Sequence, residues 1–218
     1  MAGSTYEGKR RYQSLDVAGA YDRMRFTSLK GKLTDRLEKK AIETALKKTN
    51  VLNGLVLDIP CGTGRMTEML LKKGFEIVAA DISDAMIAHA IKRNEHFGNK
   101  VKFVKADIEN LIFNDSSFDV VLTIRLMHHI PPEHHSVVLR ELSRVARRWV
   151  VITFSNKYSL QNMRRDLISR FTKSPRYSIS PSLFRQEVDE VGFNIVEYIP
   201  MLPLFSETVT VLLEKRTS

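Results

Sequence analysis

Short apolar runs alternate with amphipathic stretches along most of the chain. Such runs are typical of parallel strands that are buried on both faces, and they predict strands at 55–59, 76–80, 101–104, 117–123, 149–154, 193–199 and 207–214. Apolar positions at helical spacing predict helices over 32–48, 65–73, 83–96, 131–147 and 181–192. The first of these helices carries its apolar stripe on Leu33, Leu37, Ile42, Ala45 and Leu46.

The order of these elements predicts the fold class. Strands that alternate with helices favour an α/β fold with a doubly wound, mostly parallel sheet. The last two strands have no helix between them, so we expect them to form a terminal antiparallel hairpin. We divide the chain into an N-terminal helical cap segment, residues 1–48, and a main domain, residues 49–218, with a basic insert at 156–181.

The net charge of +9 comes mainly from residues 1–48 and 156–181. It agrees with a solvated basic surface or with an anionic partner, either nucleic acid or a membrane surface. The only cysteine, Cys61, allows no internal disulfide, and no apolar run reaches the roughly 18 residues needed to span a bilayer. Because we also find no secretory signal, we expect a soluble, cytoplasmic protein.

Three of the first four predicted strands are followed at once by a carboxylate. Ligands of open α/β sheets bind at the carboxyl ends of the strands, which are here followed by Asp58-Ile-Pro-Cys-Gly-Thr-Gly64, Asp81-Ile-Ser83, Ala106-Asp107-Ile108 and Thr123-Ile-Arg125. Carboxylates at this edge suit a ligand with hydroxyls, amines and a positive charge. The glycines allow such a ligand to approach the backbone closely.

These segments resemble the motifs of class I S-adenosylmethionine (SAM)-dependent methyltransferases. Residues 57–65 resemble the first motif, Asp81 the second and Ala106-Asp107 the third. Residues 117–125 with His128-His129 resemble the fourth motif, in the small-molecule branch that includes the ubiquinone-biosynthesis methyltransferases. The resemblance covers about residues 50–155 and implies a Rossmann-like sheet of seven strands.

The resemblance also implies SAM as the cofactor. It implies that Gly62 and Gly64 line the methionine end of SAM, that Asp58 orients the loop and the amino end, that Asp81 holds the ribose hydroxyls, and that Asp107 holds the adenine amino group. The other implied cofactor contacts are Ile82, Met86 and Ile108 around the adenine, Tyr21 folded over the cofactor, and Pro60, Cys61 and Thr123 along the loop and at the end of the fourth strand.

Pro60 departs from the family pattern, because it stands where the first glycine is usual. Proline fixes φ near about −65° and has no N–H. The loop therefore forms only if this position needs neither a positive φ nor a hydrogen-bond donor, and we expect the site to survive on Cys61-Gly-Thr-Gly.

Residues after the fourth strand are candidates for work on the methyl acceptor. His128 and His129 are candidate catalytic bases. Arg125 is a candidate for catalysis and for binding a carboxylate or phosphate of the acceptor or of the cofactor, with a solvent-facing arginine as the alternative. We expect no metal site, because no acidic or cysteine cluster completes one, and we place His134 and His135 on the solvated first turn of a helix.

The basic insert is the segment most suited to acceptor selection. Leu160, Met163, Leu167, Ile168 and Phe171 share one helical face within it. It is an acceptor lid in our first interpretation, and an interfacial helix for a lipid acceptor or a plain packed helix in the others. Tyr158 and Tyr177 are candidates for framing the acceptor pocket.

The sequence thus predicts a SAM-dependent methyltransferase that acts by in-line transfer on a small-molecule acceptor, anionic or lipid-like. A nicotinamide-dependent oxidoreductase is disfavoured because Thr67 stands where its third glycine is required. An RNA methyltransferase and a non-catalytic binding or scaffold protein remain alternatives, although no base-methylating motif follows the fourth strand. The acceptor atom, contact with a membrane and the oligomeric state stay open.

Overall fold

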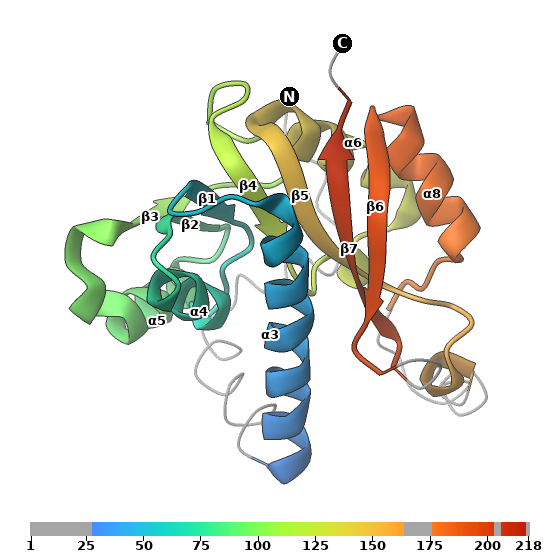
Figure 1. The fold of residues 1–218 in the computed structure, drawn as a ribbon, viewed down its shortest axis with the longest axis horizontal. Helices are drawn as coiled ribbons and strands as arrows, with labels where there is room; N and C mark the ends of the chain where they lie inside the picture. Colours follow the sequence, from blue (N-terminus) through green and yellow to red (C-terminus); the bar gives the residue numbers. More distant parts are fainter. Residues whose placement is uncertain (1–27, 164–175, 203–205, 217–218) are drawn as a thin grey trace.

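A seven-stranded sheet forms the centre of the computed structural model, which describes residues 28–163, 176–202 and 206–216. Its strand order is β3-β2-β1-β4-β5-β7-β6 (Figure 1). The strands are β1 (Leu55–Asp58), β2 (Glu76–Asp81), β3 (Val101–Lys105), β4 (Phe118–Thr123), β5 (Ala146–Ser155), β6 (Phe193–Pro200) and β7 (Thr208–Lys215). All seven agree with the apolar runs in the sequence.

The direction of the strands is also as predicted. β1 pairs in parallel with β2 on one side and with β4 on the other, so that Leu57 lies opposite Val78 and Val121. β7 is antiparallel to both β5 and β6. The predicted mostly parallel sheet with a terminal hairpin is therefore confirmed. The strand order reverses between β1 and β4, and ligands of such sheets bind in the crevice at this reversal.

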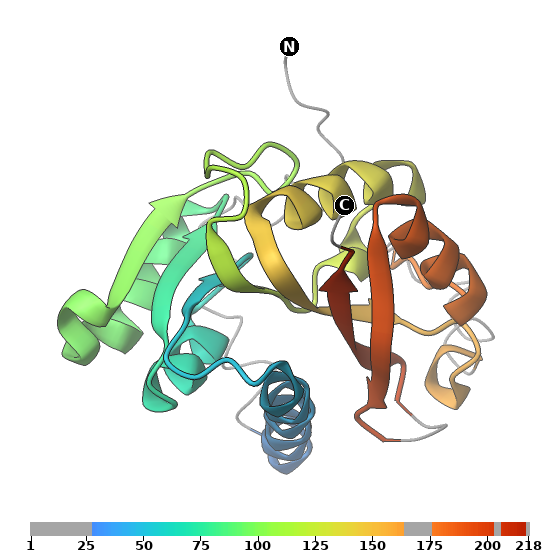
Figure 2. The same cartoon turned by 45° about the horizontal axis from the view of Figure 1, so that its top comes forward.

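Helices cover both faces of the sheet, as Figures 1 and 2 show. Buried side chains of α3, α4 and α5, such as Ile42, Leu70 and Ala90, pack on one face. Leu139 of α6 and Phe184 of α8 pack on the other. The helices are α3 (Leu29–Thr49), α4 (Arg65–Lys72), α5 (Asp84–Asn94), α6 (Pro132–Val145) and α8 (Pro181–Glu190), with 3-10 turns η1 (Glu95–Lys100) and η2 (Met127–His129). Burial on both faces explains why the strands have no polar side.

Helix starts follow the capping signals in the sequence. The Ser83 hydroxyl accepts a hydrogen bond from the Met86 N–H at the start of α5, and the Ser180 hydroxyl accepts one from the Leu183 N–H at the start of α8. Pro132 is the first residue of α6. These side-chain acceptors satisfy N–H groups that have no partner inside the helix.

The predicted apolar stripe of α3 is wrong at its N-terminal end. Ile42, Ala45 and Leu46 are buried as expected, but the Leu33 side chain is 54% exposed while Glu38 is fully buried. The reason is that the first turns of α3 extend beyond the sheet (Figure 1), where no strand covers them. The division of the chain at residue 48 stays a prediction.

The solvated position expected for His135 is also wrong, because this residue is only 1% exposed. Its Nδ1 lies 3.0 Å from Glu187 Oε2, and its Nε2 lies 3.1 Å from the Ile130 carbonyl oxygen. The start of α8 packs over the first turn of α6 and removes this imidazole from water. Within the described ranges, we find no helix with the length and apolar character that crossing a bilayer requires.

Candidate active site

One pocket lies at the carboxyl ends of β1, β2, β3 and β4. Among the residues predicted from the sequence, those that line it are Asp58, Pro60, Cys61, Gly62, Asp81, Ile82, Met86, Asp107, Ile108, Arg125 and His129. Gly64, Thr123, His128, Tyr158 and Tyr177 do not line it. Tyr21 lies outside the described residues. The pocket thus gathers segments that are up to seventy residues apart in sequence.

The loop after β1 accommodates Pro60 without a backbone conflict. The Ile59–Pro60 peptide bond is cis, and Pro60 is not among the described residues with positive φ. On either side of it, the Ile59 N–H donates to the Leu122 carbonyl at 2.9 Å and the Cys61 N–H donates to the Ala80 carbonyl at 2.8 Å. The loop is therefore pinned to β4 and β2 by its neighbours, and the missing N–H of the proline is not needed.

The two glycines of this loop differ in their surroundings. Gly62 has φ +53°, and a Cβ added there would meet nothing within 4 Å. Gly64 has φ +76°, and a Cβ there would lie 2.4 Å from Asn94 Nδ2. Gly62 therefore leaves room for a ligand beside the backbone, whereas Gly64 allows α4 to pack closely against α5.

Asp81 ends β2 and holds the loop in place. Its two carboxylate oxygens accept hydrogen bonds from the N–H groups of Gly62 and Ser83, both at 2.9 Å. Burial raises the pKa of this carboxyl, and the backbone N–H donors oppose the rise. Since an ionised carboxylate has about four acceptor sites, Asp81 can still accept hydrogen bonds from ligand hydroxyls.

Asp58 ends β1 and is 1% exposed. It accepts a hydrogen bond from the Thr67 hydroxyl at 2.6 Å. Burial raises the pKa of Asp58 to about 7, the Thr67 hydrogen bond works against this rise, and the nearby charge of Asp81 adds to it. Two buried acids side by side favour a cation in the pocket, because a positive charge stabilises both in their ionised form.

The wall formed by the ends of β2 and β3 is mainly apolar. Met86 and Ile108 are buried and line the pocket together with Ile82. Asp107 lines the same wall, and its carboxylate accepts a hydrogen bond from the Glu109 N–H at 3.2 Å. Apolar side chains with one carboxylate at the edge can hold a flat aromatic group that carries an amino substituent. Together with the open Gly62 and the acids, this donor set fits SAM.

The opposite wall includes His129, which lies in η2. Its ring stacks against that of His128 with centroids 4.0 Å apart, and the backbone carbonyl of His128 accepts a hydrogen bond from the Tyr177 N–H at 2.9 Å. Only His129 of this pair faces the pocket. Thr123 is fully buried beneath the wall, and Tyr158 is 66% exposed outside it.

The described ends of the basic insert meet beside the site. The Lys157 N–H donates to the Ile179 carbonyl at 3.0 Å, and the Ile179 N–H donates to the Ser155 carbonyl at 3.0 Å. The insert thus leaves and rejoins the molecule at the end of β5. Leu160 and Met163 are exposed, while Leu167, Ile168 and Phe171 lie outside the described residues. The lid stays a prediction.

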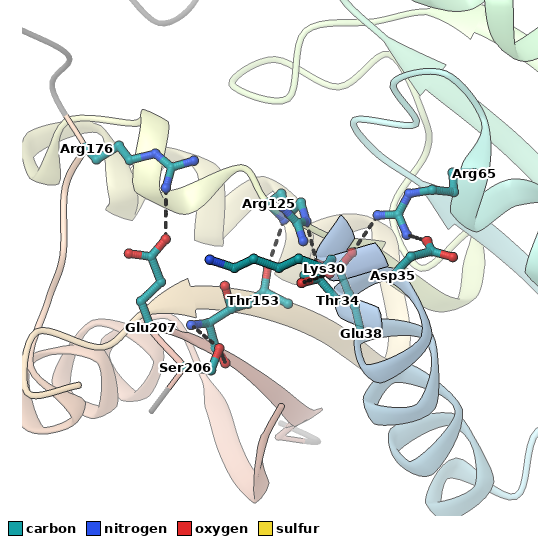
Figure 3. Close-up of polar contacts among 11 residues, drawn as sticks. Lys30, Thr34, Asp35, Glu38, Arg65, Arg125, Thr153, Arg176, Ser206 and Glu207 are labelled. Atoms are coloured by element: carbon teal, nitrogen blue, oxygen red, sulfur yellow. Dashed lines mark hydrogen bonds and ion pairs between the residues drawn. The ribbon is translucent and has the colours of Figure 1, made fainter. Parts of the chain in front are cut away.

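An ion-pair network that the sequence analysis missed borders the pocket (Figure 3). Asp35 and Glu38 of α3 contact Arg65, the first residue of α4, and Glu38 also contacts Arg125. Arg125 has φ +59°, and its N–H donates to the Thr153 hydroxyl at 2.7 Å. The Arg125 side chain therefore takes part in an ion pair, so the solvent-facing alternative is wrong.

The histidine pairs serve other contacts than metal binding. His134 Nδ1 lies 2.8 Å from Glu109, and His135 pairs with Glu187. Within the ranges that the structure describes, no group of three histidine, cysteine, aspartate or glutamate side chains could hold a metal ion.

Known proteins resemble this chain over its first five strands. Residues 56–148 match a family model described as a methyltransferase domain. Magnesium-protoporphyrin O-methyltransferase from Synechocystis sp. is 27% identical over 106 residues, which are 47% of this chain and 45% of that protein. Demethylmenaquinone methyltransferase from Clavibacter sepedonicus is 31% identical over 141 residues, which are 64% of this chain and 56% of that protein. The chain spans about half the length of these curated relatives.

The solved structures extend the likeness to the whole fold. The crystal structure of magnesium protoporphyrin IX methyltransferase from Synechocystis with bound SAH has a TM-score of 0.78 at 19% identity, covering 95% of this chain and 98% of that chain. At this identity, the likeness shows a shared fold. The family match, the strand order and the four motif segments agree, and this chain therefore contains a methyltransferase domain of the class I, SAM-dependent family.

Proposed function

We propose that the protein transfers a methyl group from SAM to a small-molecule acceptor. The observation that carries this proposal is the pocket itself, which brings Asp58, Asp81, Asp107 and the open face of Gly62 together at the carboxyl edge of a methyltransferase sheet. SAM supplies a methyl group on a positively charged sulfur, and the acids of this pocket suit that charge. The family match leaves the oxidoreductase alternative without support.

Each wall of the pocket has a role in this proposal. Asp81 accepts hydrogen bonds from the ribose hydroxyls, while Ile82 and Met86 enclose the adenine. Asp58 and the loop of Gly62 hold the amino acid end. The residues chiefly orient the reactants and exclude water, because in-line transfer gains most of its rate from positioning. No further protein group has to bond to the methyl carbon.

His129 is our candidate for the proton that the acceptor loses. The acceptor atom forms a bond to the methyl carbon, the carbon–sulfur bond breaks, and its electron pair stays on sulfur. A hydroxyl acceptor then has to lose a proton, and an imidazole at the pocket wall can receive it. Since Glu38 already matches the charge of Arg125, we propose no acceptor anion at that arginine.

The class of acceptor is the finer part of the proposal. The two curated relatives are named for a magnesium porphyrin and for demethylmenaquinone, both of which carry large unsaturated rings and long apolar parts. The exposed Tyr158, Leu160 and Met163 at the start of the insert give this chain an apolar surface beside the site. We therefore propose an apolar, ring-bearing acceptor. The buried free thiol of Cys61 supports a reducing, cytoplasmic setting.

Titration calorimetry with SAM and with SAH, its demethylated product, tests the proposal. The wild type should bind both in the micromolar range, and Asp81→Asn should weaken both by at least about tenfold, since each loses a charged acceptor for its ribose. Asp84→Asn is the matched control, because Asp84 lies outside the pocket and pairs with Lys105. A folded wild type that binds neither compound would overturn the proposal in favour of a scaffold protein. Binding without SAH production from any porphyrin or quinone acceptor would overturn the acceptor class.

A further inference from the structure

Four charged side chains meet where α3 crosses the entrance of the pocket (Figure 3). Arg65 Nη2 lies 2.5 Å from Glu38 Oε2, and Arg125 Nε lies 2.6 Å from Glu38 Oε1. Arg65 Nη1 also contacts Asp35. Each oxygen of Glu38 thus faces a different guanidinium, and one comes from the loop after β1 while the other follows β4.

Glu38 occupies a position that an apolar residue would normally fill. It lies one helical turn before Ala41 and Ile42, which belong to the buried stripe of α3, and it is itself 0% exposed. A buried carboxylate is costly unless it is paired and hydrogen-bonded. A plain structural contact at this position needs no charge, so the two ion pairs require an explanation in the surroundings of the helix.

The explanation lies in what Arg65 and Arg125 face. Both arginines line the pocket, on the same walls as Asp58, Asp81 and Asp107. Under the proposed function the pocket has to accept a cation, and two uncompensated guanidiniums would repel it. Two unit charges about 8 Å apart at an effective dielectric constant of about 20 change a binding constant roughly 30-fold. The acids of α3 remove this repulsion.

We infer that Glu38, assisted by Asp35, makes the pocket selective for the positively charged methyl donor over its neutral product. This inference rests on the proposed function and adds a residue of α3 that sets the preference between the two. Glu38 acts through the arginines and does not line the pocket, so it is a positioning residue. The same residue keeps product inhibition low, because its charge favours SAM and leaves SAH unaffected.

The test compares binding of SAM with binding of SAH, which differ by one methyl group and one positive charge. Calorimetry should show that Glu38→Gln raises the Kd for SAM at least about tenfold and the Kd for SAH less than threefold. Glu43→Gln is the matched control on the same helix, since Glu43 forms a half-exposed pair with Lys73. An equal loss for both ligands, or no loss, would overturn the inference.

A second variant predicts the opposite sign. Arg125→Gln leaves Glu38 paired with Arg65 alone and adds net negative charge at the entrance, so it should lower the Kd for SAM relative to that for SAH by several-fold. This variant decides the matter if Glu38→Gln does not fold, because an unchanged or increased ratio would refute the inference. If the folded wild type binds neither ligand, it is the proposed function that fails.

Discussion

The buried carboxyl of Asp58 gives the strongest prediction for stability. Burial places its pKa at about 7 in the folded protein, against 3.8 for the free side chain. Between these two values the native state holds a proton that the unfolded chain has lost. The free energy of unfolding therefore falls as the pH rises, by about 1.4 kcal/mol per pH unit. The contribution is fully present below pH 4 and is lost once the pH exceeds about 7.

The substitution Asp58→Asn removes this titration and keeps the shape of the side chain. The amide oxygen can still accept the hydrogen bond from the Thr67 hydroxyl, which lies 2.6 Å from the carboxylate. The full linkage effect amounts to about 4 kcal/mol at pH 8. Burial of the amide N–H groups offsets a part of it, so we expect the variant to be about 2–3 kcal/mol more stable than the wild type at pH 8.

Urea unfolding followed by circular dichroism at pH 5 and pH 8, without ligand, measures this effect. The advantage of Asp58→Asn should shrink by about 2–3 kcal/mol between pH 8 and pH 5, because the wild type keeps its proton at the lower pH. The exposed Asp84→Asn should differ from the wild type by less than about 0.5 kcal/mol at both pH values. A variant that is less stable than the wild type at pH 8, or an advantage that does not change with pH, would refute the reasoning.

Two further variants test single contacts of the structure. His129→Asn should lower kcat by about a hundredfold for a hydroxyl acceptor and leave the Kd for SAM unchanged; with the exposed His89→Asn as control, a loss of SAM binding instead of kcat would contradict the role of His129 as a base. Glu187→Gln should lower the free energy of unfolding by about 1–3 kcal/mol in urea titrations, because it removes a charged partner 3.0 Å from the buried His135. The exposed Glu190→Gln is its control, and an equal effect of the two substitutions would show that the His135 contact contributes nothing specific.

The fold could be predicted because its signals are local. Each strand is a short apolar run, and each helix start carries a cap such as Ser83 or a proline such as Pro132. The hairpin of β6 and β7 followed from the absence of a helix between them. The pocket acids were found for the same reason, since Asp58 and Asp81 each end a strand, and parallel strands end at one edge.

What the sequence could not predict are contacts between distant segments that have no periodic signature. His135 was placed in solvent because nothing near it in sequence shows that α8 packs over it. The same holds for Gly64, whose closest neighbour is Asn94 in the next helix. In both cases the deciding partner lies thirty or more residues away.

The entrance network shows where a clue in the sequence existed and how it was misread. Counting apolar residues in α3 placed Leu33 in the stripe, whereas the face that packs against the molecule continues through Glu38 instead. A carboxylate in line with buried residues is costly without cations nearby. Such a position therefore predicts that arginines arrive from elsewhere, and Arg65 and Arg125, each directly following a ligand-binding segment, were the natural candidates. The charge that interrupts the apolar stripe is thus the feature that ties α3 to the cofactor pocket.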